Sequence, residues 1–195
     1  ILDPTKTKYT LDYYVKMAKE LEKRGAHTLC IKDMSGLLKP VAAFRLIKAL
    51  KNEVAVPIHL HTHDTSGNGV ATLMLAAEAG VDIVDAAFNS MSGLTSQPAL
   101  NSFVAALENS ERDTMMDTRG LQRISDYWSD VRPVYGDFES DLKATTAEIY
   151  RLEIPGGQYS NLKPQVESFG IGYKFDEVKD MYVKVNKMLG DIIKV

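Results

Sequence analysis

The chain contains 195 residues, of which 45% are hydrophobic and 25% are charged. These proportions are ordinary for a globular protein and exclude collagen-like, low-complexity and intrinsically disordered classes. The formal net charge is only −3, so long-range electrostatics predicts neither nucleic acid nor an anionic membrane as a partner. The most apolar stretch, residues 70–88, is interrupted by Glu78, Asp82 and Asp85, which excludes a membrane span there. The single cysteine, Cys30, allows no internal disulfide and fits a reducing compartment.

Three strand-then-helix units are expected in the first half of the chain. Short apolar runs predict strands over residues 27–31, 56–63 and 81–88. Helical periodicity predicts helices over residues 11–21, 40–50, 70–79 and 99–107. Gly25 and Gly80 mark helix ends, and Pro40 suits the first turn of a helix.

The spacing of the three strands indicates a parallel α/β sheet. Successive strands end about 25–30 residues apart, which leaves room for one crossover helix each. A closed (β/α)₈ barrel needs eight strands, so the pattern predicts either part of a TIM barrel or a small open sheet. Neither a G-x-G-x-x-G motif nor a Walker loop opens a helix after these strands, which disfavours a nucleotide-binding sheet.

The second half of the chain has a different pattern and is expected to be mainly helical. Helices are predicted over residues 121–131, 163–168 and 175–189, with a Pro-Gly-Gly turn at residues 155–157 and an extended tail over residues 191–195. The change falls near residue 110. We therefore expect barrel-type βα units over residues 1–110 and a helical extension over residues 111–195.

Three histidines lie in one predicted strand at alternating positions: His59, His61 and His63. Side chains alternate across a strand, so all three point to one face. His61 and His63 are at the carboxyl end, where parallel α/β folds gather their ligands, and two imidazoles at this spacing can hold one divalent ion. The alternative is a set of buried histidines hydrogen-bonded to neighbouring strands. His59 lies deeper and is interpreted as a supporting residue.

Lys32 ends the first predicted strand, where a lysine has three possible roles. If it faces the barrel interior among apolar neighbours, desolvation lowers its pKa and frees the amine as a nucleophile. The amine could then form a Schiff base, or react with carbon dioxide to give a carbamate that ligates a metal through oxygen. The third possibility is a lysine at the rim paired with Asp33.

Two further polar residues in the predicted strands have weaker signals. Asp85 could support a ligand, although pairing with a backbone amide is the more common arrangement. Cys30 has no cationic activator apart from Lys32, so packing is expected rather than nucleophilic chemistry.

Several motifs together resemble the carboxyltransferase domain of the pyruvate carboxylase family. They are Ile-Lys-Asp-Met-Ser-Gly-Leu-Leu-Lys-Pro at residues 31–40, His-Leu-His-Thr-His-Asp-Thr-Ser-Gly-Asn-Gly at residues 59–69, Ser-Met-Ser-Gly-Leu-Thr-Ser-Gln-Pro at residues 90–98 and Ile-Pro-Gly-Gly-Gln-Tyr-Ser-Asn-Leu at residues 154–162. The resemblance spans nearly the whole chain in the order of the family. It implies an α/β fold consisting of the last strands of a (β/α)₈ TIM barrel and a mainly helical, funnel-like extension.

The resemblance also implies roles by position. Lys32 matches the carboxylated lysine of the family, a catalytic residue and metal ligand, and His61 and His63 match its two histidine ligands. The metal would be Mn²⁺ or Zn²⁺. Gln158 matches a residue of the loop that lines the substrate and biotin region. Another ligand of the family, an aspartate, and an arginine that binds the substrate carboxylate come from early strands without a counterpart here; the proton-shuttling threonine follows the position of Val195.

The implied activity is transfer of CO₂ from carboxybiotin to pyruvate, which gives oxaloacetate. Biotin would arrive on a carrier domain and ATP would be used by another domain. A homo-oligomer, a tetramer by resemblance, is expected in the bacterial cytoplasm or the mitochondrial matrix. Two alternatives keep the barrel: a biotin-dependent oxaloacetate decarboxylase or a transcarboxylase subunit, and more distantly a metal-dependent aldolase or acyl-transfer enzyme. A further alternative is a non-catalytic fragment, because the chain carries only half of the implied site.

Overall fold

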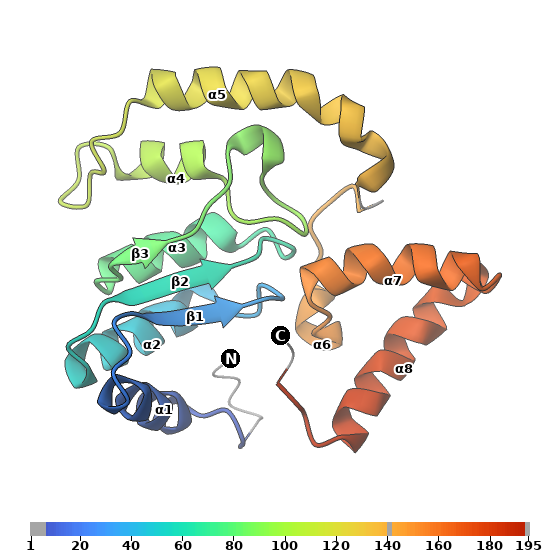
Figure 1. Cartoon of the computed structure of the whole chain (residues 1–195), viewed down its shortest axis with the longest axis horizontal. Coiled ribbons are helices and arrows are strands. Elements are labelled where there is room, and N and C mark those ends of the chain that lie inside the picture. The colour runs from blue at the N-terminus through green and yellow to red at the C-terminus, as the bar shows by residue number, and fades with distance from the viewer. Residues whose placement is uncertain (1–6, 140–141, 194–195) are drawn as a thin grey trace.

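The computed structural model describes residues 7–139 and 142–193 and places a three-stranded parallel sheet in the first half of the chain (Figure 1). Its strands are β1 (Leu29–Asp33), β2 (Ile58–Thr62) and β3 (Ile83–Val84), in the order β1-β2-β3. Cys30 pairs with His59 and Lys32 with His61 in the β1–β2 register. The expected parallel α/β sheet is therefore present.

Helices alternate with the strands as the apolar periodicity predicts. They are α1 (Leu11–Lys23), α2 (Pro40–Glu53), α3 (Gly69–Glu78) and α4 (Leu100–Leu107). The Thr10 hydroxyl caps α1 by accepting the N–H of Tyr13, and Pro40 occupies the first turn of α2. Gly25 follows α1 with φ +91°, a backbone conformation that glycine adopts without steric cost.

The main core lies between the sheet and helices α2 and α3. Ile58 and Leu60 of β2 are fully buried on the face that these helices cover, against Leu46, Ile47 and Leu73. The strand alternation then leaves the histidines of β2 on the opposite face, where burial is only partial. Apolar packing on one face of β2 thus determines which side chains are available on the other.

The third strand is much shorter than the expected run over residues 81–88. The backbone N–H groups of Asp82 and Asp85 still donate to the carbonyls of Ile58 and Leu60. Beyond Asp85 the chain leaves β2, since Ala87 donates its N–H to Pro98 and accepts one from Leu100. The segment after β3 therefore pairs with its own returning loop, in which η1 (Asn89–Met91) is a short 3₁₀ turn.

The described part of the second half is helical, as expected. It contains α5 (Thr118–Val131), η2 (Arg132–Phe138), α6 (Ile149–Leu152), α7 (Gly156–Ser168), η3 (Gly172–Lys174) and α8 (Phe175–Met188). The prediction of a turn at residues 155–157 was wrong, because Pro155 is the N-cap of α7 and the two glycines form its first turn. Residues 191–193 are not assigned to a strand, and residues 194–195 of the expected extended tail lie outside the described ranges.

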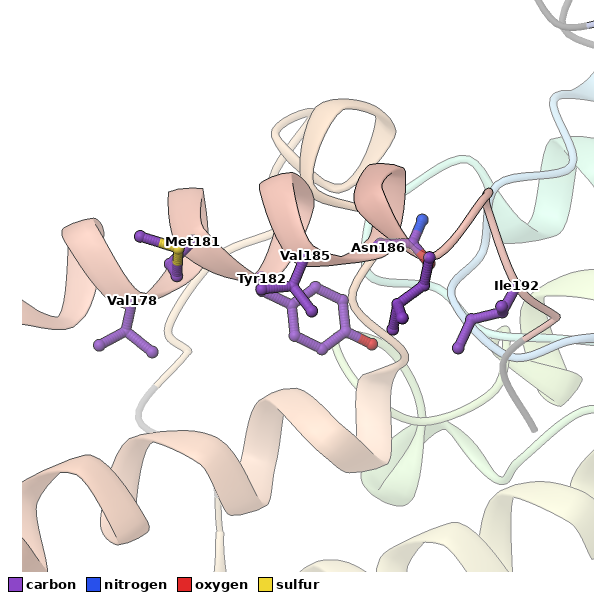
Figure 2. Close-up of a pocket in the computed structure, with 7 residues that line it drawn as sticks. Val178, Met181, Tyr182, Val185, Asn186 and Ile192 are labelled. Atoms are coloured by element: carbon purple, nitrogen blue, oxygen red, sulfur yellow. The ribbon is translucent and has the colours of Figure 1, made fainter.

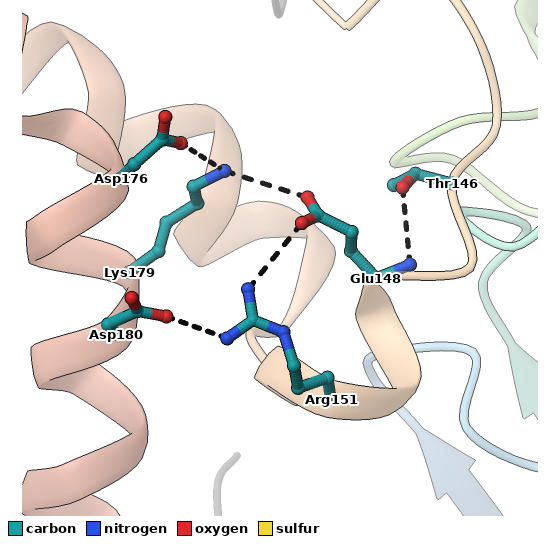
Figure 3. Close-up of polar contacts among 6 residues, drawn as sticks. All are labelled: Thr146, Glu148, Arg151, Asp176, Lys179 and Asp180. Carbon is teal, nitrogen blue, oxygen red and sulfur yellow. Dashed lines mark hydrogen bonds and ion pairs between the residues drawn. The ribbon is translucent and has the colours of Figure 1, made fainter.

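Ion pairs connect α6 to α8, as Figure 3 shows. Lys179 of α8 is buried and lies 2.7 Å from Asp176 and 3.6 Å from Glu148. Arg151 of α6 lies 2.6 Å from Asp180 and 3.5 Å from Glu148. Although burial of Lys179 opposes its charge, these carboxylates raise the pKa of the amine above its ordinary value. The short helix α6 is thereby attached to α8.

Two apolar hollows are open at the surface. A cavity of about 570 Å³ runs along β1, which is an edge strand among the described residues, and against α1, with Tyr14, Met17 and Ile31 in its wall. A second, of about 360 Å³, lies along α8, where Figure 2 shows the side chains of Tyr182, Val185 and Ile192. Within the described residues, the helices are all too short or too polar to cross a membrane.

Candidate metal centre

The site begins with the histidines that β2 presents on its uncovered face. His59, His61 and His63 are each partly buried, and Leu60 and Thr62 between them are buried on the other face. The carboxyl end of β2 points toward α6 and α7 of the helical half (Figure 1). The expectation that the three histidines share one face is consistent with this burial pattern.

Two oxygen acceptors determine which nitrogen carries the proton in each of the last two histidines. The Nδ1 atom of His61 lies 2.7 Å from Oδ2 of Asp85, and Nδ1 of His63 lies 2.6 Å from the carbonyl oxygen of Thr95. Neither acceptor carries a proton to donate, since the Asp85 carboxylate is ionised. Both Nδ1 atoms are therefore donors, and in the neutral rings both Nε2 atoms bear a lone pair.

The electrostatics of the site favours this state. Partial burial acts to raise the pKa of Asp85, but hydrogen bonds from His61 and His59 more than offset it, and the pKa is lowered. Burial lowers the pKa of His63, opposed by its hydrogen bond to Thr95 and assisted by nearby His61. His63 is thus neutral at neutral pH, the form that binds a metal.

The two free nitrogen atoms converge, which is the strongest indication of a cation site. Nε2 of His61 and Nε2 of His63 are 3.4 Å apart. Two lone pairs facing each other at this distance repel, unless a cation or a proton lies between them. Two nitrogen ligands of one tetrahedral zinc, each at about 2.0–2.1 Å, are about 3.4 Å apart. The donor set and its spacing therefore fit a divalent metal.

Lys32 is placed directly across from His61, but not in the predicted environment. The two are register partners in adjacent parallel strands, so they share a face. We expected an apolar, desolvated interior; the residue is instead exposed, because the described elements leave this face of β1 uncovered. Cys30 is exposed on the same face rather than packed, and its pKa is raised by partial burial and by Asp85.

Pairing of Lys32 with Asp33 is not seen among the ion pairs of the described residues. The Asp33 carboxylate is buried and accepts the backbone N–H groups of Leu37 and Leu38 and the hydroxyl of Thr62, at 2.8–2.9 Å. Asp33 therefore belongs to the turn after β1 and links it to β2. Lys32 remains on the other face of the strand, beside the histidines.

The described residues do not complete a metal site by themselves. They contain no group of three or more His, Cys, Asp or Glu side chains arranged to hold one ion. Two histidines leave coordination positions to be filled by other donors. Lys32, lying across from His61, is a donor only if its amine is neutral or chemically modified.

The amino end of α7 packs directly against the histidine pair. A methyl group added to Gly156 would lie 2.9 Å from the Thr95 carbonyl oxygen and 3.1 Å from Nδ1 of His63. The N–H of Gly156 donates to the carbonyl of Met34, in the turn after β1. Gln158, in the same first turn of α7, is exposed and its Oε1 accepts the Tyr182 hydroxyl at 2.6 Å.

Sequence reasoning missed two participants of this site, Thr95 and Gly156, and found only a weak signal for a third. Asp85 was expected either to support a ligand or, as the favoured alternative, to pair with a backbone amide; its carboxylate contacts two imidazoles, those of His59 and His61. Thr95 acts through its carbonyl group, which any residue could supply, so its side chain gives no signal. Gly156 was assigned to a turn. The Gly-Gly pair after Pro155 was the one signal in the sequence that this backbone lies close to another segment, here that of His63 and Thr95.

Comparison with known proteins gives the family. The family profile described as HMGL-like matches residues 4–127. The chain belongs to the HMGL-like family. A second profile, described as a conserved carboxylase domain, matches residues 149–195.

Curated relatives match along the whole chain. They include "Pyruvate carboxylase" of Staphylococcus aureus, 59% identical, and of Bacillus subtilis, 55% identical, and "Pyruvate carboxylase, mitochondrial" of Homo sapiens, 48% identical. Each match covers 100% of this chain but only 17% of the relative. The chain therefore spans about one sixth of the length of these relatives.

Solved structures of similar sequence confirm the fold. The carboxyl transferase domain of Rhizobium etli pyruvate carboxylase is 53% identical, with a TM-score of 0.97 over 100% of this chain and 33% of that domain. The same domain solved with pyruvate and biocytin matches equally well. The resemblance found in the sequence is confirmed, and so is the fold class: part of a (β/α)₈ barrel with a mainly helical extension.

Proposed function

We propose that this chain is the part of a biotin-dependent pyruvate carboxylase that carries two histidine ligands of the carboxyltransferase metal centre. The parent enzyme moves CO₂ from carboxybiotin to pyruvate; the methyl carbon of pyruvate loses a proton to biotin and gains the carboxyl group, which gives oxaloacetate. The observation that carries the proposal is the convergence of Nε2 of His61 and Nε2 of His63, which lie 3.4 Å apart. The relatives favour this activity over the decarboxylase and transcarboxylase alternatives.

The metal, Mn²⁺ or Zn²⁺, would stabilise negative charge developing on the enolate form of pyruvate. His61 and His63 would hold it through Nε2. Asp85 and the Thr95 carbonyl keep both rings in the tautomer that leaves Nε2 free. This part of the chain therefore supplies two neutral donors with their orientation fixed in advance.

Lys32 is proposed as a third ligand after carboxylation. Its neutral amine would add to CO₂ with loss of one proton, and the resulting carbamate would carry an anionic oxygen. Its position across from His61 supports this role. The exposure of Lys32 leaves that face of β1 to be covered by other parts of the parent protein, which would also bring the remaining ligands.

The other contributors lie on other domains of the parent. Biotin would be delivered by a carrier domain, and ATP would be used by the domain that carboxylates it. Gln158 is proposed to line the substrate and biotin region; its hydrogen bond to Tyr182 and its place in the turn of α7 that contains Gly156 support this. We place the boundary between the βα units and the helical extension at residues 110 and 111.

Assembly and compartment follow from the relatives. We propose a homo-oligomeric parent, a tetramer, that works in the cytoplasm if bacterial and in the mitochondrial matrix if eukaryotic. Relatives in both bacteria and animal mitochondria support the two possibilities.

Lys32→Ala in the full-length enzyme tests the proposal. We expect loss of metal-dependent oxaloacetate formation, whereas ATP-dependent carboxylation of biotin on its own domain continues. Lys48→Ala, which removes an exposed lysine of α2, is the matched control and should leave both activities unchanged. Retention of oxaloacetate formation by Lys32→Ala would refute the role of Lys32. Unchanged metal content in His61→Ala and His63→Ala would refute the metal centre.

A further inference from the structure

We propose that Asp85 is the positioning residue of the metal centre, acting on His61 as part of a three-residue unit, His59–Asp85–His61. The inference rests on the proposed function, because it concerns the orientation of one of the two histidine ligands. It assigns a role to two residues, Asp85 and His59, that are not among the proposed metal ligands.

The backbone places Asp85 between the two rings. Its N–H donates to the carbonyl of Leu60 at 3.0 Å, which continues the ladder between β2 and β3 by one residue. Leu60 lies between His59 and His61 in the sequence, and both histidines point to the face opposite Leu60. One carboxylate at this position therefore reaches a ring on either side.

Each oxygen of the Asp85 carboxylate accepts a hydrogen bond from a different histidine. Oδ1 lies 2.8 Å from Nε2 of His59, and Oδ2 lies 2.7 Å from Nδ1 of His61. Because each oxygen accepts from a different ring, rotation of the carboxyl group would break both hydrogen bonds. His59 thus fixes the orientation of Asp85, and Asp85 fixes that of His61.

The consequence for His61 is a fixed ring orientation and a fixed tautomer. Holding the proton on Nδ1 leaves Nε2 as the lone-pair donor toward the side of His63. Without Asp85 the His61 ring could turn or carry its proton on Nε2, which would block metal binding. Loss of such a partner typically costs about 10–100-fold in metal affinity.

The alternative is a purely structural role, in which Asp85 only ties β3 to β2. The chain supplies a matched control for this. Asp82, at the other end of β3, accepts the backbone N–H of Ile58 at 2.7 Å and pairs with Lys51. Among the hydrogen bonds and ion pairs of the described residues, none joins Asp82 to a histidine. Asp82→Asn should weaken the same pair of strands without altering the histidines.

The experiment titrates Co²⁺ into the metal-free, full-length enzyme and records the dissociation constant and the visible absorption of bound Co²⁺. Asp85→Ala should raise the dissociation constant 10–100-fold and change the absorption bands. Asp85→Asn keeps the shape and one acceptor oxygen, and should give a smaller increase. Asp82→Asn should lower the melting temperature and leave the constant and the bands as in the unmodified enzyme.

Two outcomes contradict the inference, and they are distinguishable. If His61→Ala loses Co²⁺ while both Asp85 variants bind it with unchanged affinity and bands, the positioning role is wrong and the metal centre stands. If His61→Ala binds Co²⁺ like the unmodified enzyme, the metal centre itself is wrong and the inference fails with it. Asp85→Asn preserves the size of the side chain and keeps the test decisive if Asp85→Ala does not fold.

Discussion

Among single residues, Gly156 is where the helical half approaches the metal centre most closely. Gly156→Ala would bring a methyl group to 2.9 Å from the Thr95 carbonyl oxygen and 3.1 Å from Nδ1 of His63. Both atoms belong to one hydrogen bond, so relieving the overlap displaces the His63 ring or the start of α7. We expect a loss of about 1–3 kcal/mol in stability, together with weaker metal binding.

Gly157→Ala is the control for this prediction, because an added methyl group there meets nothing within 4 Å. Thermal unfolding and metal content of the full-length enzyme measure both effects. Equal melting temperatures and metal contents for the two variants would show that the close approach of α7 to His63 has no energetic importance.

Tyr14 gives a prediction about alkaline pH. Its half-buried phenol lies near Tyr13 and Tyr9, and burial first, then these neighbours, raise its pKa from 10.0 to about 12. Between these two values the unfolded chain loses a proton that the folded chain retains. The stability contributed by Tyr14 is therefore complete below pH 10 and is lost as pH rises through that window.

A tyrosinate absorbance titration of the full-length enzyme and of Tyr14→Phe checks the value. The difference between the two curves isolates the missing phenol and should rise near pH 12. A difference that rises near pH 10 would show that the Tyr14 phenol is hydrated like a free tyrosine.

Residue-level prediction from sequence succeeded where side-chain type and spacing were both informative. The pattern His-x-His determines a shared face through strand alternation alone. The hydrogen-bond partners of the rings are the carbonyl of Thr95 and the carboxylate of Asp85, which directly follows β3. Their positions depend on the strand register and the path of the loop, which the sequence pattern does not contain. The predicted apolar environment of Lys32 was wrong, because that prediction assumed a closed barrel around β1.

At the scale of elements, ion pairs of a buried cation, Lys179, and of an exposed cation, Arg151, attach α6 to α8. Lys179→Ala would remove a buried side chain whose Nζ lies 5.5 Å from the centre of the Phe175 ring, and it would leave Asp176 and Glu148 without their shared partner. Since these carboxylates can hydrate once the amine is gone, we expect a cost of about 1–2 kcal/mol. Thermal unfolding of the full-length enzyme measures it.

Arg151→Ala is the comparison, because its ion pair with Asp180 is exposed on both sides (Figure 3). Exposed ion pairs contribute little to stability and are screened by salt. We therefore expect a smaller loss than for Lys179→Ala, and one that vanishes at high ionic strength. A larger loss for Arg151→Ala would contradict the ranking by burial.

Prediction of elements from the sequence worked for helices with strong periodicity and failed at two boundaries. The expected strand over residues 81–88 is two residues long, because hydrogen bonds to the loop at Pro98 take the chain away from β2. The α7 helix begins at Gly156 although glycine is a poor helix former. The short β3 and the start of α7 at Gly156 both depend on tertiary contacts, which local helix and strand propensities do not describe.

At the scale of the whole molecule, the position of β1 and the two apolar hollows predict that the isolated chain associates. Among the described residues β1 is an edge strand of the sheet, and a cavity of about 570 Å³ with a largely apolar wall lies beside it. Light scattering after size-exclusion chromatography should show oligomers or aggregates. The complete carboxyltransferase domain of the proposed parent enzyme is the control, because we expect its other strands to cover these surfaces. A stable monomer of the isolated chain would contradict the prediction.

The fold class was predictable because three strands at βα spacing exclude most other architectures. The strand pattern alone could not decide between part of a barrel and an open sheet, since a three-stranded parallel sheet is common to both. Solved relatives decided it. The site was predictable only in part. Two of its donors, His61 and His63, are two residues apart in the sequence, whereas the groups that orient them come from distant segments.

The hydrogen bonds of Asp33 have a consequence for the order in which the chain folds. They join the end of β1, the following turn and the end of β2 within 30 residues, so this βαβ unit closes only short loops. The contacts of Thr146 with Thr65 and of Gly156 with Met34 span 81 and 122 residues. During synthesis, the strand bearing His61 can therefore form early, well before α7 emerges from the ribosome to pack against His63.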